Sequence, residues 1–397
     1  MTQPAQSTSN PLLQLWRNQE SRGVIIQIIT MAVVFALLAA IVRNVVINLE
    51  AVGKEFSFGF LLWPAAYDIG FSPFLEYTNQ STHLRAAVVG LLNTLLIAFW
   101  GCILATLVGF VLGIMRLSSN WLVSKLSYAF VEFMRNVPIL IHILAIYAMV
   151  VTLLPPAKKA LNVGADAFFL SNRGFYVPSP VFEDGATIVG VVLLISIVLV
   201  YFFKRWARRQ QDDTGKIYPV LWVSLGILVA LPGIAFVATG MPLSWDIPVL
   251  KGFNFKGGMA IKPEFLALWL ALSLYTACFI AEIVRAGILA VSHGQTEAAF
   301  ALGLRPNRTL QLIIIPQALR VIVPPLCSQY LNLTKNSSLA IAIGYMDITA
   351  TLGGISLMQT GKEMETMLIV MGVYLVISLL ISSFMNWFNH RIKLTER

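Results

Sequence analysis

Long apolar runs separated by short polar stretches dominate the chain. Each run is a candidate membrane span, because about 20 residues of helix cross the hydrocarbon core of a bilayer. Only helices and closed barrels satisfy every backbone hydrogen bond in lipid, and runs of this length are typical of helices. We therefore predict an all-α integral membrane protein with about eight transmembrane helices, at 24–47, 88–114, 126–153, 187–203, 218–238, 264–286, 310–333 and 366–389.

Composition supports this pattern. Of 397 residues, 57% are hydrophobic and 12% are charged, and the mean hydropathy is +0.77. Soluble proteins carry about 25% charged residues, so an ordinary soluble protein is excluded. A net charge of +9 would suggest nucleic acid for a soluble protein. Here the cations lie between apolar runs, where they are topology signals, so membrane lipid and not nucleic acid is the expected surrounding.

The distribution of Lys and Arg predicts the orientation. With an even number of spans, both termini lie on one side of the membrane. Placing them in the cytoplasm gives the shorter inner segments more basic residues than the longer outer ones, and the cluster KRWARRQQ at 204–211 contributes most. The positive-inside rule thus predicts cytoplasmic termini. The first run, 24–47, is too long for a signal-peptide core, so no cleavable signal is expected.

Cysteine and histidine usage predicts no metal site. Cys102, Cys278 and Cys327 fall in apolar stretches without paired spacing, and the four histidines are scattered singly. The cysteines are therefore interpreted as small buried hydrophobic residues.

Small residues recur every four positions in two of the runs. This spacing places them along one helix face, where they allow another helix to approach closely. Helix packing is the interpretation we adopt for both stripes, which are Gly101, Ala105, Gly109 and Gly113 in the second run and Ser273, Ala277 and Ala281 in the sixth.

A polar segment at 294–316 lies between two apolar runs. Its Glu297–Ala299 stretch favours a helix, which Gly303 can end, and Pro306 can begin a second helix at its first turn. We expect two short helices at an angle to each other, lying on the membrane surface.

The residues of this segment, at their spacings, resemble the EAA loop of bacterial ABC importer permeases. The resemblance implies an importer of type I with a five-helix transmembrane core, and a loop that fits a cleft in a separate ATPase subunit. It also implies that Glu297 helps to hold the loop's shape and does no chemistry. The matched residues are Glu297, Ala298, Ala299, Gly303, Ile313 and Pro316, with Ile315 where the family usually has Leu.

Several other stretches are similar to the polar amino acid (histidine/glutamine/arginine-type) subfamily. The length of the chain is most like the long permease subunits of general L-amino acid or glutamate/glutamine/aspartate/asparagine transporters. The similar stretches are Asn93–Leu95, Arg135–Ile139 (departing at Asn136 and Val137), Ala281–Ile288, Gly294–Gln295 and Lys335–Leu339.

The resemblance divides the chain into four parts. Residues 88–153 and 264–397 match the permease core, and the second part includes the EAA loop. Residues 1–87 hold an N-terminal cytoplasmic tail, an extra transmembrane helix and an outer loop. Residues 154–263 form an insert with two further helices. Its outer segments, 154–186 and 239–263, are rich in Pro, Gly and aromatic residues and are candidates for small caps on the outer face.

Charged residues inside apolar runs are candidates for a translocation path, because each is costly at the bilayer centre. Arg135 follows Glu132 by three residues, and Arg285 follows Glu282 by three, so each pair can interact on one helix face. Two interpretations fit both pairs: a structural ion pair near the inner surface, or a site that faces a pore.

Lys335 is followed by Asn336, Ser337 and Ser338. A cation with neutral hydrogen-bonding neighbours suits a carboxylate in a water-lined path, and a lysine at the outer interface is the alternative. Prolines at 316, 324 and 325 predict a bend and an interruption of the preceding helix.

The resemblance implies a non-enzymatic subunit that forms half of the translocation path for L-amino acids in a bacterial inner membrane. Implied partners are ABC ATPase subunits, a second related permease in a heterodimer, and a periplasmic amino-acid-binding protein. The chain lacks a phosphate-binding loop, since Gly361-Lys362 has neither the earlier Gly nor the hydroxyl residue. ATP is therefore used by a partner, and no cofactor is expected on this chain.

Two other functions are considered. A self-sufficient secondary transporter often shows inverted repeats and acidic residues deep in the membrane, and neither is evident here. A membrane scaffold or receptor would leave the polar segment 294–316 without a stated partner.

Overall fold

The computed structural model describes residues 19–51, 53–164 and 166–392. Within this part, seven helices are long and apolar enough to cross a membrane, or up to eight if a bent pair counts as one span. The predicted all-α membrane class and the number of spans are confirmed. Most of the expected N-terminal tail, at 1–18, and the C-terminal residues 393–397 lie outside the described residues.

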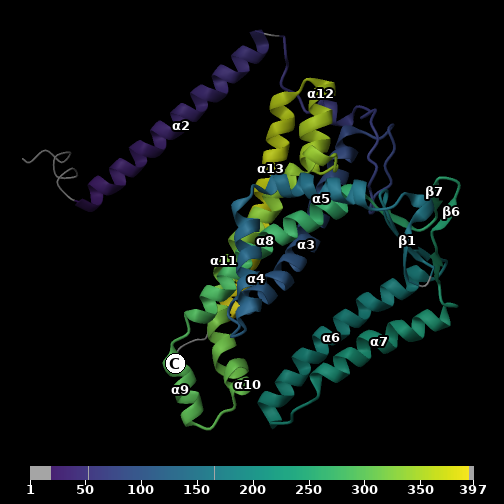
Figure 1. The fold of residues 1–397 in the computed structure, drawn as a ribbon. Helices are drawn as coiled ribbons and strands as arrows, with labels where there is room; N and C mark the ends of the chain where they lie inside the picture. The colour runs from purple at the N-terminus through teal and green to yellow at the C-terminus, as the bar shows by residue number, and fades with distance from the viewer. Residues whose placement is uncertain (1–18, 52, 165, 393–397) are drawn as a thin grey trace, which may run out of the picture.

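Helices account for most of the described chain (Figure 1). The helices are α2 (Gln19–Ala51), η1 (Gly59–Leu62), α3 (His83–Arg116), α4 (Trp121–Asn136), α5 (Ile139–Leu153), η2 (Ala157–Lys159), α6 (Ala186–Thr214), α7 (Val220–Ala238), α8 (Pro263–Leu289), α9 (His293–Ala301), α10 (Pro306–Thr309), the π-helix η3 (Leu310–Ile314), α11 (Ile315–Asn336), the 3-10 helix η4 (Ser337–Ile343), the π-helix η5 (Thr349–Ser356), α12 (Leu357–Thr360) and α13 (Glu363–Ile392).

The two stripes of small residues face each other where α3 packs against α8. A Cβ atom added to Gly109 would lie 2.6 Å from Cγ2 of Ile280 and 2.9 Å from the Ala277 carbonyl oxygen. Farther along, the Ser273 hydroxyl donates to the Gly101 carbonyl at 3.4 Å. Glycine is required here because any larger side chain would separate the two backbones. The predicted packing role is confirmed.

The α3–α8 pair lies at the centre of the hydrophobic core. The largest buried cluster joins α3, α5, α8 and α11, and its fully buried members include Ile97, Ile143, Leu268 and Leu333. Figure 1 shows these helices crossing in one bundle, with α13 beside α11.

The prediction of one continuous span at 126–153 is wrong. It is broken into α4 and α5, which are bent by 107°. Val137, between them, has extended backbone at φ −97° and ψ 134°. Proline disfavours the helical conformation of the preceding residue, so Pro138 accounts for the break.

The interruption expected at Pro324 and Pro325 is also wrong. Helix α11 runs from Ile315 to Asn336 with both prolines inside it. Prolines are tolerated in membrane helices when neighbouring groups satisfy the freed backbone carbonyls.

The hairpin of α6 and α7 makes its main packing contacts within itself. Its buried residues are few, and Ser196, Val200 and Ala207 mark the face of α6 that contacts α7. Helix α6 extends beyond the predicted span 187–203 to Thr214, so the basic cluster expected in a loop is helical. Lys, Arg and Gln are good helix formers, which explains the extension.

Both outer segments of the insert fold together into a small β unit, an exception to the all-α class. Antiparallel strands form one four-stranded sheet in the order β1-β2-β3-β8 and two hairpins, β4-β5 and β6-β7. Phe169, Tyr176 and Phe255 pack in its centre. The strands are β1 (Leu161–Gly164), β2 (Phe168–Ser171), β3 (Gly174–Val177), β4 (Ser179–Phe182), β5 (Leu243–Asp246), β6 (Val249–Lys251), β7 (Asn254–Lys256) and β8 (Met259–Ile261).

Candidate functional site

The segment 294–316 begins with α9, which ends at Ala301 in a hydrogen-bonded C-cap. Gly303 adopts the left-handed conformation at φ +74°. Its N–H donates to the Phe300 carbonyl at 2.9 Å, and the Leu304 N–H donates to the Ala299 carbonyl at 3.1 Å. This is the Schellman arrangement, which favours glycine because other residues are strained at this φ. The predicted role of Gly303 in ending the helix is confirmed.

The second half of the segment differs from the expected short surface helix. Pro306 opens α10, as predicted, but α10 continues through η3 into α11 without a break. Pro316 lies in the first turn of α11, directly after the π-helix. The π-helix is rare, and it occurs mostly as a single turn inside a longer α-helix, as it does here. The result is one short helix, α9, connected by a tight turn to one long helix.

One face of α9 is anchored to this long helix. Ala299 is 1% exposed, and Thr309 of α10 is equally buried. The amide of Gln317 donates to the Gln295 side-chain oxygen at 3.2 Å, which connects α9 directly to α11. This hydrogen bond and the buried Ala299 are the contacts that join α9 to the long helix.

The opposite face of α9 is open. Glu297 and Ala298 are exposed, and the Glu297 carboxylate contacts only the His293 ring, at 3.1 Å, among the described residues. Phe300 is 49% exposed and Leu302 is 81% exposed. Exposed apolar side chains that are grouped next to polar ones can mark a contact with another protein or with the membrane.

Glu282 holds together three helices near the end of α8. Its carboxylate accepts from Arg285 at 2.6 Å, as predicted, and also pairs with Arg116 of α3. The Arg116 guanidinium stacks over the Tyr128 ring of α4 at 5.2 Å. The sequence-based prediction missed Arg116, although an arginine that ends a long apolar run was a visible signal. The Glu282–Arg116 ion pair therefore connects α8 to α3, and the contact of Arg116 with Tyr128 extends the connection to α4.

Arg135 lies at the end of α4, just before the break with α5. Its guanidinium is 3.7 Å from the Glu132 carboxylate and stacks over the Phe279 ring at 5.3 Å. The predicted pair with Glu132 is therefore present. The buried Nε atom has no hydrogen-bond partner among the described residues.

The four candidates at 335–338 do not converge on one point. Lys335 is exposed, whereas Ser337 is fully buried and donates to the Thr334 carbonyl at 2.8 Å. Ser338 donates to the Lys335 carbonyl at 2.8 Å, which leaves the lysine ammonium as the outward group.

A buried carboxylate, Asp347, escaped the sequence analysis. It lies between η4 and η5, is fully buried, and accepts from the Tyr374 hydroxyl at 3.1 Å and the Ala350 N–H at 2.8 Å. The same tyrosine contacts Ser337 and Thr349. The signal was an isolated acid between two apolar stretches, which costs free energy unless hydrogen bonds satisfy it.

The stretch that opens the permease core holds this segment in place. Thr94 accepts the Ile348 N–H at 3.1 Å. Asn93 donates to the Met346 carbonyl at 2.9 Å, and its own carbonyl accepts the Tyr345 hydroxyl at 3.0 Å. Asn93 and Thr94 are therefore positioning residues for the turn after η4.

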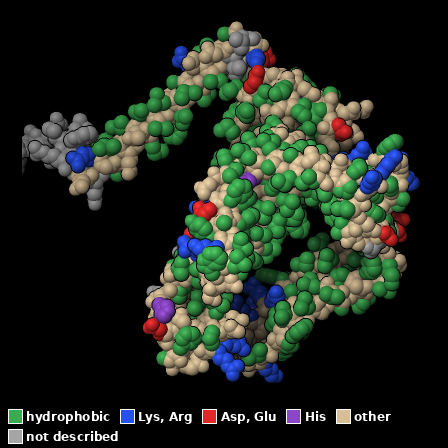
Figure 2. Space-filling view, viewed as in Figure 1, with side chains coloured by type: hydrophobic (Ala, Val, Ile, Leu, Met, Phe, Trp, Pro, Cys, Tyr) green, Lys and Arg blue, Asp and Glu red, His purple; other side chains and the backbone are tan. Residues whose placement is uncertain are grey.

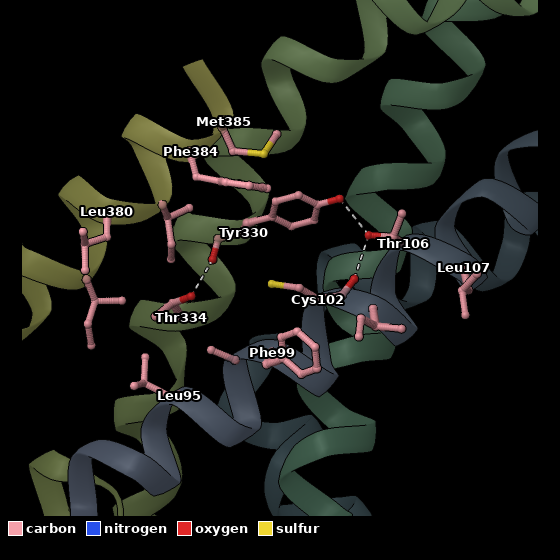
Figure 3. Close-up of a pocket in the computed structure, with 14 residues that line it drawn as sticks. Leu95, Phe99, Cys102, Thr106, Leu107, Tyr330, Thr334, Leu380, Phe384 and Met385 are labelled. Carbon is pink, nitrogen blue, oxygen red and sulfur yellow. Dashed lines mark hydrogen bonds between the residues drawn. The ribbon is translucent and has the colours of Figure 1, made fainter. Parts of the chain in front are cut away.

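An apolar cavity of about 660 Å³ lies among α3, α11 and α13 (Figure 3). Thr106 and Tyr330 share a hydrogen bond of 2.8 Å on its wall, and most other lining groups are apolar. None of the predicted path residues lines it. Its chemistry suits hydrocarbon better than a charged solute.

Comparison with known proteins gives this geometry its context. Residues 105–394 match the family model described as binding-protein-dependent transport system inner membrane component. The chain belongs to this family. The family assignment confirms the resemblance and the type of fold: this is a bacterial multi-pass inner-membrane permease subunit without catalytic activity, whose system uses a separate ATPase chain. A self-sufficient secondary transporter is not favoured.

Relatives of this permease subunit extend over its whole length. It is 44% identical over 396 residues to the general L-amino acid transport system permease protein AapQ of Rhizobium johnstonii, covering 100% of this chain and 98% of that protein. It is 46% identical over 406 residues to the glutamate/glutamine/aspartate/asparagine transport system permease protein BztB of Rhodobacter capsulatus, with 95% of each chain covered. A crystal structure of an amino acid ABC transporter with histidines superimposes with a TM-score of 0.46 and 20% identity, over 78% of this chain and 95% of that one.

Proposed function

We propose that this permease subunit forms half of the translocation path of an ATP-driven importer for L-amino acids. The observation that carries the substrate class is the full-length likeness to permeases named for general L-amino acid and for acidic amino acid and amide transport. The inserted β unit and α6–α7 hairpin lie within the length that both relatives share with this chain, so the likeness is not limited to the core helices.

The proposed contact with the ATPase is the open face of α9. Glu297 and Ala298 line this face, and Phe300 and Leu302 present apolar side chains beside it. An ATPase cleft that covers these side chains would remove apolar surface from water. Ala299 and Gly303 act through the shape of the turn, and Pro316 through the start of α11.

Nucleotide acts on the partner and not on this chain. ATP-driven closure of two ATPase subunits would move α9, and the contact between Gln295 and Gln317 would carry that motion into α11. We infer that the chain itself binds no cofactor.

A second permease subunit completes the path. Helix α2 packs little against the rest of the chain in the described residues, and α13 presents an apolar outer face. Large unpaired helix faces of this kind suit a partner of similar construction as well as lipid. The resemblance to long permeases favours a related, non-identical partner, and an external amino-acid-binding protein would deliver the solute.

The proposed orientation places the termini, α9 and the α6–α7 turn in the cytoplasm. Figure 1 places α9, α10 and this turn at the same end of the molecule. Figure 2 shows basic side chains near that end and also over the β unit, whereas hydrophobic side chains cover the flanks of the helices. The proposed orientation therefore rests on the basic residues that follow the apolar part of α6, under the positive-inside rule.

Within the path, Lys335 is the preferred candidate for contact with solute, with Asn336 and Ser338 beside it. Its exposed ammonium could bind an amino acid carboxylate in a charge-assisted hydrogen bond. We assign Ser337 and Glu282 structural roles instead, because their polar groups are engaged with the protein itself. Arg135 is also assigned a structural role, because its guanidinium lies beside Glu132 and over the Phe279 ring.

The test is purification followed by reconstitution. A tagged chain expressed with its neighbouring subunits should co-purify an ATPase and a related permease. Proteoliposomes loaded with the complex and its binding protein should take up L-amino acids only with ATP. Uptake without nucleotide by this chain alone, or uptake of sugars in place of amino acids, would contradict the proposal.

A further inference from the structure

The C-terminal part of α6 carries four cations that have no ion-pair partner among the described residues. Lys204, Arg205, Arg208 and Arg209 are all exposed. Asp212 and Asp213 lie four residues after Arg208 and Arg209 but form no ion pair with them among the described residues. Four positive charges therefore stand against two negative ones at this end of α6, and an external anion can neutralise the excess.

Most of these cations point away from α7. Ser196, Val200 and Ala207 mark the face of α6 that packs against α7. At about 100° per residue, Arg205 and Arg209 lie roughly opposite that face, whereas Arg208 lies about 100° and Lys204 about 60° from its centre. All four are exposed, so they are open to the surroundings of the hairpin.

Helix electrostatics do not account for the cluster either. Cations stabilise a helix in its last turn, where the carbonyl ends of the dipole lie. The last turn of α6 holds Asp212 and Asp213 and no basic residue, and the cations come one to two turns earlier. Their position therefore serves something other than the helix end.

The position of these cations along α6 places them at the level of the lipid headgroups. The apolar part of α6 ends at Phe203, and the cations begin at the next residue. Residues 204–209 cover about 8 Å of helix axis, close to the roughly 5–7 Å of a headgroup layer. Trp206 packs against Tyr218, in the turn before α7, with 5.0 Å between ring centroids. Aromatic side chains of this kind mark the membrane–water interface.

We propose that the base of the α6–α7 hairpin is a binding site for the phosphate headgroups of anionic phospholipids in the inner leaflet. The site comprises Lys204, Arg205, Arg208 and Arg209. Guanidinium groups form paired hydrogen bonds with phosphate oxygens, and clustered cations next to a membrane helix favour headgroups with more than one negative charge. Bound lipid would hold in place a hairpin that packs little against the core.

Lipid binding by the whole complex tests this site. The purified complex in neutral detergent is titrated with cardiolipin, phosphatidylglycerol or phosphatidylcholine, and bound lipid is counted by native mass spectrometry. We expect cardiolipin to bind at least about tenfold more tightly than phosphatidylcholine, and the preference to weaken as salt is added. Equal binding of anionic and zwitterionic lipid by the unaltered complex would overturn the proposal.

Three variants locate the site. The fourfold change Lys204→Gln, Arg205→Gln, Arg208→Gln and Arg209→Gln should remove the preference for anionic lipid. Exchanging Lys and Arg at these positions should keep it, since the charge is unchanged. A matched loss of four exposed cations in and beside the β unit should also keep it, through Lys158→Gln, Lys159→Gln, Lys251→Gln and Lys256→Gln.

The same preparations distinguish lipid from a protein partner. If the first variant binds lipid normally but loses the ATPase subunit, the cations contact protein and the proposal fails. If it keeps the ATPase and loses the lipid preference, the proposal stands. Amino acid uptake does not enter either outcome, so this test is independent of the proposed transport function.

Discussion

Two helix pairs of this protein, α3–α8 and α6–α7, are both apolar enough to cross a membrane but differ in how far they are buried in the chain. In α8, 61% of the most apolar window is buried, against 11% in each of α6 and α7. Gly109 and Gly113 of α3 touch the backbone and side chains of α8, whereas Gly190 of α6 and Gly226 of α7 have no neighbour within 4 Å of an added Cβ atom.

The difference shows what holds helices together in lipid. Apolarity alone does not drive association there, because lipid tails are as apolar as leucine. Helices associate where small residues let their backbones approach closely, as the stripes of α3 and α8 do. The α3–α8 pair is thus the fixed frame to which the α9 coupling segment is connected through α11, and the hairpin is an accessory.

The largest difference between the two helix pairs is expected when a glycine in each is replaced by a large side chain. Gly109→Leu should remove most folded, inserted protein, because the new side chain would overlap Ile280 and the Ala277 carbonyl. Gly226→Leu, on the open face of α7, should leave the amount of inserted protein unchanged. Fluorescence-detected size exclusion in detergent measures both. Equal losses would mean that the two pairs are packed alike.

The next test distinguishes loss of transport coupling at the α9 turn from loss of the folded α3–α8 pair. Gly303→Pro should reduce uptake to background while the protein remains inserted, because proline removes the N–H bonded to Phe300 and cannot adopt φ +74°. Gly294→Ala in the same helix is the control. Its added Cβ has space, at 3.6 Å from Ser292, and uptake should persist. Full uptake by the proline variant would remove the turn from the coupling mechanism.

Glu297→Lys probes the open face of the same helix. It should also abolish uptake with insertion intact, since it reverses a charge that is 71% exposed and that pairs, within the described part of the chain, only with His293. Uptake assays are paired with pulldown of the ATPase. If uptake is lost while the ATPase still binds normally, a docking role for this face is contradicted.

A smaller effect is expected in the path. Lys335→Ala should raise the apparent KM for uptake by about 10–100-fold, the range given by losing one charge-assisted hydrogen bond of about 1.5–3 kcal/mol. Lys335→Arg should restore part of the loss because the cation is kept. Unchanged kinetics in the alanine variant would place this lysine outside the path.

The smallest change concerns stability. Thr94→Val removes the acceptor of the buried Ile348 N–H, which costs about 1–3 kcal/mol. Thr152→Val is the matched control, since this exposed threonine bonds only to its own helix, at Ala148. Thermal unfolding in detergent should show a lower midpoint for the first variant alone.

The sequence was sufficient where a local pattern has one physical meaning. The small-residue stripes, the helix end at Gly303, the helix start at Pro306 and the Glu282–Arg285 pair all followed from spacing. In each case the interacting groups are close in sequence or repeat with the helical period.

It was insufficient where distant groups decide the outcome. The break before Pro138 and the continuity through Pro324 and Pro325 involve the same residue type with opposite results, so the presence of proline alone does not predict whether a helix is interrupted. The β unit required strands separated by the α6–α7 hairpin to pair, as β3 does with β8. Asp347 and Arg116 acquired roles only from partners far along the chain.

In the proposed mechanism, α9 is the surface through which a separate ATPase moves this permease. Crosslinking can detect this contact, with Leu302→Cys in a chain whose Cys102, Cys278 and Cys327 are replaced. We expect a crosslink from this position to the ATPase subunit whose yield changes with ATP, and none from Leu153→Cys, a similarly exposed leucine at the end of α5. Absence of the Leu302→Cys crosslink in a complex that still transports would contradict the claim.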